Sequence, residues 1–176
     1  MRFDVTMSRV SSGLALVAVL ASSPAAAQAG WQEYAFPKDG FAARYPGQPL
    51  LGEHSYDTRL GSSATERVYS FDAGGIVYAV AIADFGTARP ERDKAIDEAA
   101  ARLMAMGRLT HDVSARLNWN YGRELRVESA DGTSYTDAIF LIGNKLLQLK
   151  VIYPVHSDAA GSAGIHYFQQ AVRLLD

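Results

Sequence analysis

Two short turn signals constrain the fold of this chain most, because each one sets the register of a hairpin. Asp131-Gly132 and Gly143-Asn144 are dipeptides typical of two-residue β-turns. Such turns pair residue 126 with residue 137, and residue 137 with residue 150. The sequence therefore predicts three adjacent antiparallel strands on which Arg126, Asp137 and Lys150 stand side by side. Each such pair of opposite charges contributes about 0.2–1 kcal/mol.

The stretch "YGRELRVESADG", residues 121–132, is rich in charge, and the same register gives its charges a structural role. They alternate with apolar side chains, as on a strand with one wet face and one buried face. On the buried face, Leu125 and Val127 are expected to meet Ala138 and Thr136 across the hairpin. We therefore interpret the stretch as a strand rather than as an acid–base site.

Further strands are predicted upstream by apolar patterning. Residues 31–45 form a hairpin around the turn "PKDG", and residues 53–58 and 64–71 form the next two strands. Residues 76–85 are apolar on both faces, which is typical of a central strand covered on both sides.

Two segments have a helical period instead. Residues 90–106 repeat small and apolar side chains every three or four positions, with Pro90 suited to a first helical turn and Gly107 to a C-terminal stop. After a last long strand that ends at Pro154, the tail predicts a C-terminal helix. The expected fold class is α+β: a mostly antiparallel sheet with an amphipathic helix after the central strand and a C-terminal helix.

The N-terminus has the three regions of a secretory signal peptide, with translation starting at Met1 or Met7. A basic start is followed by the apolar run Leu14–Ala21 and by small residues, so cleavage is expected after Ala27 or Ala29. We expect residues 1–29 to be the signal and residues 30–176 to be a single domain in the periplasm or outside the cell. The sequence contains no cysteine, so neither a disulfide nor a cysteine-linked lipid is expected.

Composition excludes some classes of partner. Lys and Arg number 17 against 19 Asp and Glu, a net charge of −2, and the basic residues form no run. Binding to nucleic acid or to an anionic membrane surface needs a basic patch, so neither is expected. No second stretch is apolar and long enough to span a membrane.

Patterns for catalysis or metal binding are weak. The four histidines show no metal-ligand spacing, and no serine lies in a Gly-x-Ser-x-Gly elbow. His156 with Asp158 is the nearest approach to a metal pair. Glu124 and Glu128 could each pair with a distant carboxylate for glycoside hydrolysis, but their arginine neighbours favour salt-bridged strand residues. We predict no catalytic residue, no cofactor and no metal, so the chain is not expected to be an enzyme.

Trp119, Tyr121 and Arg123 form the candidate partner surface. Trp, Tyr and Arg are the residues that most often anchor protein interfaces. Large aromatic side chains are also usually buried, so Trp119 has two interpretations at this point, core residue or partner anchor.

Four segments resemble the PsbP/Mog-type α-β-α sandwich family, and within it the exported bacterial DcrB-like proteins. They are "FAARYPGQP", "YGRELRV", "LLQLKVIYP" and "HYFQQAVRLL". The resemblance implies the sandwich fold across residues 31–175. It also implies a habit of binding other proteins without catalysis, since the family includes extrinsic photosystem subunits, Ran-binding proteins and chaperones of secreted effectors. Function does not follow from fold, and no binding motif of the family can be placed on individual residues here.

Three functions remain open. The first is a non-enzymatic exported accessory protein that binds another envelope protein. The second is a small-ligand or metal-binding protein that uses the cleft between the sheet and the C-terminal helix. The third is a hydrolase based on dispersed carboxylates. The oligomeric state and the identity of a partner or ligand do not follow from the sequence.

Overall fold

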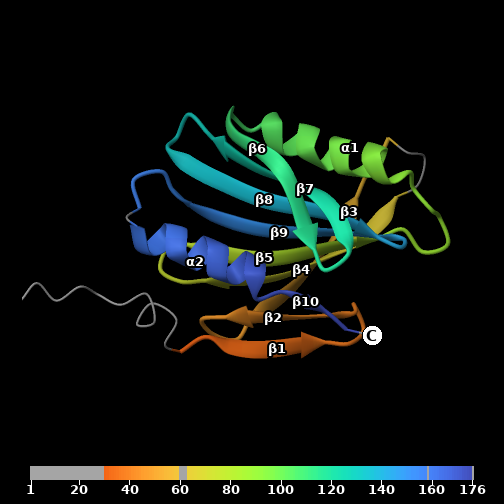
Figure 1. Cartoon of the computed structure of the whole chain (residues 1–176), viewed down its shortest axis with the longest axis horizontal. Helices are drawn as coiled ribbons and strands as arrows, with labels where there is room; N and C mark the ends of the chain where they lie inside the picture. The colour runs from red at the N-terminus through yellow and green to blue at the C-terminus, as the bar shows by residue number, and fades with distance from the viewer. Residues whose placement is uncertain (1–29, 60–62, 158, 176) are drawn as a thin grey trace, which may run out of the picture.

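The computed structural model describes residues 30–59, 63–157 and 159–175, and the expected signal segment 1–29 lies outside them (Figure 1). The described residues form ten strands and two helices. In chain order these are β1 (Gln32–Phe36), β2 (Phe41–Tyr45), β3 (Leu50–Tyr56), β4 (Ala64–Asp72), β5 (Val77–Asp84), α1 (Arg92–Met104), β6 (Arg108–Leu117), β7 (Asn120–Glu128), β8 (Thr133–Ile142), β9 (Lys145–Pro154), α2 (Ala159–Gln170) and β10 (Arg173–Leu174).

The strands form two antiparallel sheets that pack in layers with the helices. The large sheet has the order β3-β4-β5-β9-β8-β7-β6, and the small sheet has the order β1-β2-β10. Helix α1 lies over one face of the large sheet, whereas α2 and the small sheet lie on the other (Figure 1). This arrangement confirms the predicted α+β class, with one helix after the long strand β5 and one near the C-terminus.

Each face of the large sheet has its own apolar core. On the α1 side, buried residues of the helix such as Ile96 and Leu103 pack with Leu125 and Ile139 of the sheet. On the other side the core is largely aromatic, and the ring of Trp31 lies 4.9 Å from that of Tyr78 and 5.1 Å from that of Tyr167. Edge-to-face contacts of this kind add about 0.5–1.5 kcal/mol per pair beyond simple burial.

Most of the predicted elements are present with small shifts at their ends. The hairpin at residues 31–45 is β1–β2, and the two-sided strand at 76–85 is β5, whose residues 78–83 are all buried. Helix α1 is shorter than the predicted 90–106, because Glu91 occupies its N-cap and Ala105 its C-cap. Gly164 of α2 has a packing role, since a Cβ there would lie 2.5 Å from the Tyr78 hydroxyl.

The predicted register of the first hairpin is wrong by one residue, whereas that of the second is confirmed. In the second hairpin, Ile142 pairs with Lys145 and Asp137 pairs with Lys150, as expected. In the first, Arg126 pairs with Thr136, and Asp137 lies opposite Leu125. Arg126 therefore faces the opposite side of the sheet from Asp137, so the predicted ladder of three charges reduces to Asp137 and Lys150.

The turn between β7 and β8 explains the shift. The Ser129 N–H donates to the Thr133 carbonyl at 2.9 Å, which closes a three-residue loop rather than a two-residue turn. Gly132 has a φ of 82°, the left-handed conformation that such loops require at their last residue. The Asp131 carboxylate accepts hydrogen bonds from the Ser129 hydroxyl and the Thr133 N–H, which favours this longer loop.

Asp137 is consequently a buried acid on the α1 face of the sheet. Its residue is 2% exposed, and its Oδ2 accepts a hydrogen bond from Gln148 at 2.9 Å. Lys150 Nζ lies 3.8 Å from the same oxygen, and Oδ1 has no hydrogen-bond partner among the described residues. Burial outweighs the attraction of Lys150 and raises the pKa of Asp137 to about 6.

Asp137→Asn is expected to stabilise the protein at pH 7.5 and to change little at pH 4. The raised pKa means that the folded state holds the Asp137 proton more tightly than the unfolded chain does, so stability is lost as pH rises from about 4 to about 6. Raising the pKa of Asp137 from its ordinary value to about 6 corresponds to at most about 3 kcal/mol in the free energy of unfolding. Urea unfolding at both pH values measures this difference.

Asp112→Asn is the control, and we expect it to change the stability at pH 7.5 in the opposite direction. Arg123 holds the pKa of Asp112 below its ordinary value, chiefly by hydrogen bonding, so this substitution should destabilise at pH 7.5. Equal effects of Asp137→Asn at both pH values would contradict the assignment of a buried proton to Asp137.

Gly122→Ala is expected to destabilise the fold, because β7 approaches β8 too closely there for a side chain. An added Cβ would lie 2.1 Å from the Ile139 carbonyl oxygen and 2.4 Å from the Phe140 ring. Overpacking of this kind costs about 1–3 kcal/mol or more in the free energy of unfolding. Gly52→Ala in β3 is the matched control, since the nearest atom there is on the His54 side chain at 3.3 Å; a similar loss in both variants would refute the packing argument.

Candidate partner surface

The hairpin formed by β6 and β7 presents two aromatic side chains to solvent at its tip, which we define as residues 116–121. Asn118 and Trp119 form the turn, and Asn118 has a φ of 53°, a conformation that Asn tolerates better than most residues. Arg116 Nε donates to the Asn118 carbonyl at 2.8 Å, and its guanidinium lies 5.5 Å from the centre of the Trp119 ring. These contacts fix the tip without burying the indole.

Exposure decides between the two interpretations of Trp119. Its side chain is 86% exposed and that of Tyr121 is 62% exposed, so neither belongs to the core. Trp31, by contrast, packs against the aromatic core below α2. A sequence signal for the exposed position was present in "NWN", because asparagines on both sides of Trp119 are typical of a turn.

Arg123, the third residue of the predicted surface, lies in an ion-pair cluster beside the tip. Its Nε and Nη2 donate to the two carboxylate oxygens of Asp112 on β6 at 2.8 and 2.7 Å. Its Nη1 donates to Asp97 of α1 at 3.0 Å. The side chain is 28% exposed and ties the hairpin to the helix, so its role is to position the surface around it.

A groove lies between α1 and the hairpin, next to the tip. Its volume is about 550 Å³, and it is open to solvent. Ile96 and Asp97 line it from the helix, and Val113, Tyr121 and Arg123 line it from the hairpin. The groove therefore places apolar side chains, an aromatic ring and a fixed ion pair within one concave surface.

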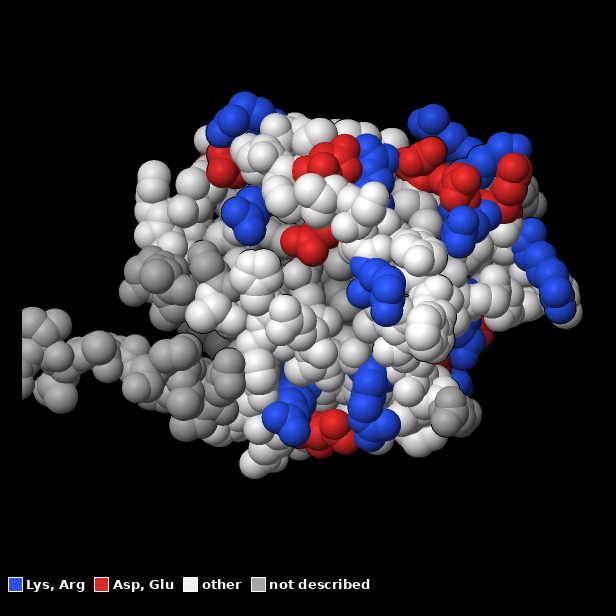
Figure 2. Space-filling view, viewed as in Figure 1, with Lys and Arg blue, Asp and Glu red and all other residues white. Residues whose placement is uncertain are grey.

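Strand β6 is an edge strand, and this adds backbone groups to the surface. It pairs with β7 alone among the described strands, and nine of its ten residues are exposed or half-buried. An exposed edge offers unpaired N–H and C=O groups to an extended segment of another chain. Figure 2 shows that charged side chains on this face gather over α1 and near β1, while the band between them, where Figure 1 places the hairpin tip, carries few.

A second hollow, the α2 cleft, lies where the sequence predicted a ligand site, between the sheet and the C-terminal helix. Its volume is about 460 Å³, and Phe140 and Leu149 form part of its apolar floor. Glu124 and Gln169 also line it. In the described structure the Glu124 carboxylate has no ion-pair partner within 4.0 Å, and Gln169 Nε2 is buried without a hydrogen-bond partner.

The structure does not bring together the other residues that were candidates for catalysis or metal binding. Glu128, the second candidate carboxylate on this strand, forms an ion pair with Arg108 at 2.5 Å. Asp158, the predicted companion of His156, lies outside the described residues. Within the described residues no group of three or more His, Cys, Asp or Glu side chains has the arrangement of a metal site, and no helix is long and apolar enough to cross a membrane.

Comparisons with known proteins identify the fold. No family model matches the sequence, and no curated protein matches it. The solution structure of cyanobacterial PsbP (CyanoP) from Synechocystis sp. PCC 6803 is similar, with a TM-score of 0.57 and 13% sequence identity. The alignment covers 83% of this chain and 93% of that protein. The chain therefore has a PsbP-like α+β fold, as the short motifs predicted.

Proposed function

We propose that the chain is a non-enzymatic, exported accessory protein that binds another envelope protein through the tip of the β6–β7 hairpin. The proposal places the protein in the periplasm or outside the cell, on the basis of the signal-like segment at residues 1–29. Within the PsbP-like fold it assigns the chain to the exported DcrB-like group, on the basis of the sequence motifs.

The exposure of Trp119 and Tyr121 is the observation that carries this proposal. Folded proteins usually bury most of a tryptophan, and an indole that is 86% exposed leaves a large apolar surface in water. Burying such rings against a partner recovers that surface at little entropic cost, which is why Trp and Tyr dominate the energetics of interfaces. The adjacent groove and the open edge of β6 supply further contacts for the same partner.

Ligand binding in the α2 cleft is a second candidate function, and the unpaired Glu124 carboxylate favours it. A half-buried carboxylate above an apolar floor suits a small ligand with a cationic or hydroxyl group. The buried Nε2 of Gln169 would gain an acceptor from such a ligand.

A carboxylate-based hydrolase has less support. Among the described residues that line the α2 cleft, Glu124 is the single carboxylate, whereas glycoside hydrolysis uses two. The groove by the hairpin has more acids, but Asp97 and Asp112 are held by Arg123.

The double variant Trp119→Ala, Tyr121→Ala is expected to lose the partner. Envelope extract of the source cells is passed over the immobilised parent protein and the variant, and captured proteins are identified and then titrated in purified form. Hot-spot residues contribute about 2 kcal/mol or more each, so the affinity for the purified partner should fall at least about thirtyfold.

Leu50→Ala, Leu51→Ala is the matched control, because it removes two exposed apolar side chains, 76% and 55% exposed, from the opposite edge strand β3. This variant should keep the partner. Circular dichroism confirms that both variants are folded. A partner retained by the Trp119 and Tyr121 variant would move the surface elsewhere, and the absence of any captured protein would favour the α2 cleft.

A further inference from the structure

A third hollow, which we call the β10 cavity, lies where the small sheet meets the large sheet. Its volume is about 390 Å³, at the lower end of the range of about 300–1,000 Å³ found for small-molecule sites. It involves residues of β2, β5, β8, β9 and β10 and shares none with the hairpin groove or the α2 cleft. Its walls are mainly apolar and are made by Phe41, Ile82, Ile142, Leu147, Leu174 and Leu175.

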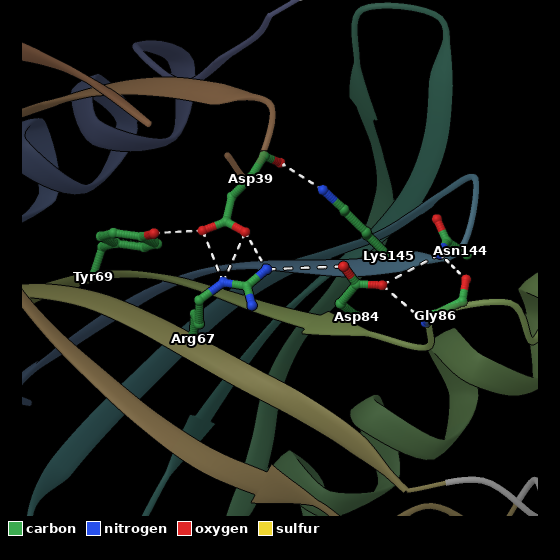
Figure 3. A network of polar contacts seen from close by, with 7 residues as sticks. All are labelled: Asp39, Arg67, Tyr69, Asp84, Gly86, Asn144 and Lys145. Carbon is green, nitrogen blue, oxygen red and sulfur yellow. Dashed lines mark hydrogen bonds and ion pairs between the residues drawn. The ribbon is translucent and has the colours of Figure 1, made fainter. Parts of the chain in front are cut away.

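One end of the β10 cavity is polar, and the charge of its acid, Asp39, is already balanced by an ion pair with Arg67. The Asp39 carboxylate accepts two hydrogen bonds from Arg67 Nε at 2.8 and 3.0 Å and one from the Tyr69 hydroxyl (Figure 3). Burial would raise the pKa of Asp39, but the hydrogen bonds from Arg67 and Tyr69 outweigh it and hold the pKa below its ordinary value. Asp39 is therefore ionised, and Arg67 is its ion-pair partner within the protein.

Asp84 lies next to this end of the cavity without being one of its lining residues, and its carboxylate already has partners. Asp84 Oδ1 accepts hydrogen bonds from the Gly86 N–H at 2.9 Å and from Asn144 Nδ2 at 3.2 Å. Asp84 Oδ2 lies 3.8 Å from the Arg67 guanidinium (Figure 3). Arg67 thus stands between the two carboxylates and serves both.

Among the described residues Lys145 forms no ion pair, although its charge helps to hold the pKa of Asp39 below its ordinary value. Its Nζ donates to the Asp39 main-chain carbonyl at 3.3 Å, and no carboxylate of the described residues lies within 4.0 Å of it. An ammonium group has three N–H donors, so two remain for another acceptor. The half-buried Lys145 lines the cavity beside apolar walls, where a charge–charge contact is screened less than at an open surface.

We propose that the β10 cavity binds a small monocarboxylate with an apolar body, such as a medium-chain fatty acid. The carboxylate pairs with Lys145 Nζ, and the apolar body lies against Phe41, Ile82 and Leu174. Among the described residues that line the cavity, Lys145 is the one cation and can pair with one carboxylate, and the apolar walls exclude a strongly hydrated dianion because they offer it no further donors. This site is independent of the partner surface at the hairpin.

Octanoate is the probe, and 1-octanol, which has the same chain without the charge, is its control. Titration of the purified protein is followed by NMR of the methyl groups of Ile142, Leu147 and Leu174, at probe concentrations below micelle formation. Octanoate should shift these resonances at saturation and bind at least about tenfold more tightly than 1-octanol, because a charge-assisted hydrogen bond is stronger than a neutral one.

Lys145→Met should weaken octanoate about tenfold or more while leaving 1-octanol unchanged. Lys38→Met removes the same charge from an exposed side chain in the adjacent turn that is not among the residues lining the cavity, and should leave octanoate binding intact. Leu174→Trp, which keeps Lys145 but fills the cavity, should abolish binding of both probes and supplies a test if Lys145→Met does not fold. Three results would overturn the proposal. They are equal affinity for the two probes, equal effects of Lys38→Met and Lys145→Met on octanoate binding, and chemical-shift changes that do not include the methyl groups of the cavity.

Discussion

Burial of strands β5, β9 and β8 on both faces is the constraint on which the rest of the structure depends. These inner strands carry long runs of buried residues, so each face of the large sheet needs its own cover. Helix α1 supplies one cover, and α2 with the small sheet supplies the other. The chain has no cysteine, so these two apolar interfaces, with their hydrogen bonds and ion pairs, hold the layers together.

The need to cover both faces of the large sheet also determines where the enclosed polar groups lie. Arg67 on β4 reaches Asp39 in the turn of the small sheet, so an ion pair connects the two sheets at the edge of their apolar contact. Asp137 is less well compensated, because Lys150 lies at 3.8 Å from one carboxylate oxygen and the other oxygen has no hydrogen-bond partner among the described residues. A buried acid of this kind is costly when ionised, and its position opposite Leu125 results from a single extra residue in the preceding loop.

The proposed binding sites lie where the two covers of the large sheet end. The β6–β7 hairpin extends to the edge of the large sheet, so Trp119 and Tyr121 remain in water. The α2 cleft and the β10 cavity occur at the margins of the second cover, next to Glu124 and Lys145. A PsbP-like fold therefore explains how these sites are positioned, but their chemistry comes from side chains that the fold does not require.

The sequence by itself determined most of the repeating structure: the strands other than β10, both helices, and the second hairpin, in which Gly143-Asn144 sets Asp137 opposite Lys150. Local periodicity predicts these features because the repeat of the backbone, and the side of an element on which apolar side chains lie, depend on residues close together in the sequence. Side chains within the loop decided the register of the first hairpin, because Ser129 and Asp131 favour a longer loop than the turn dipeptide predicts. Tertiary structure alone decided that Trp31 packs against the core while Trp119 stays in water, and which acids meet Arg67. Those outcomes depend on contacts between segments far apart in the chain, and the fit of packed layers selects such contacts, not the local pattern.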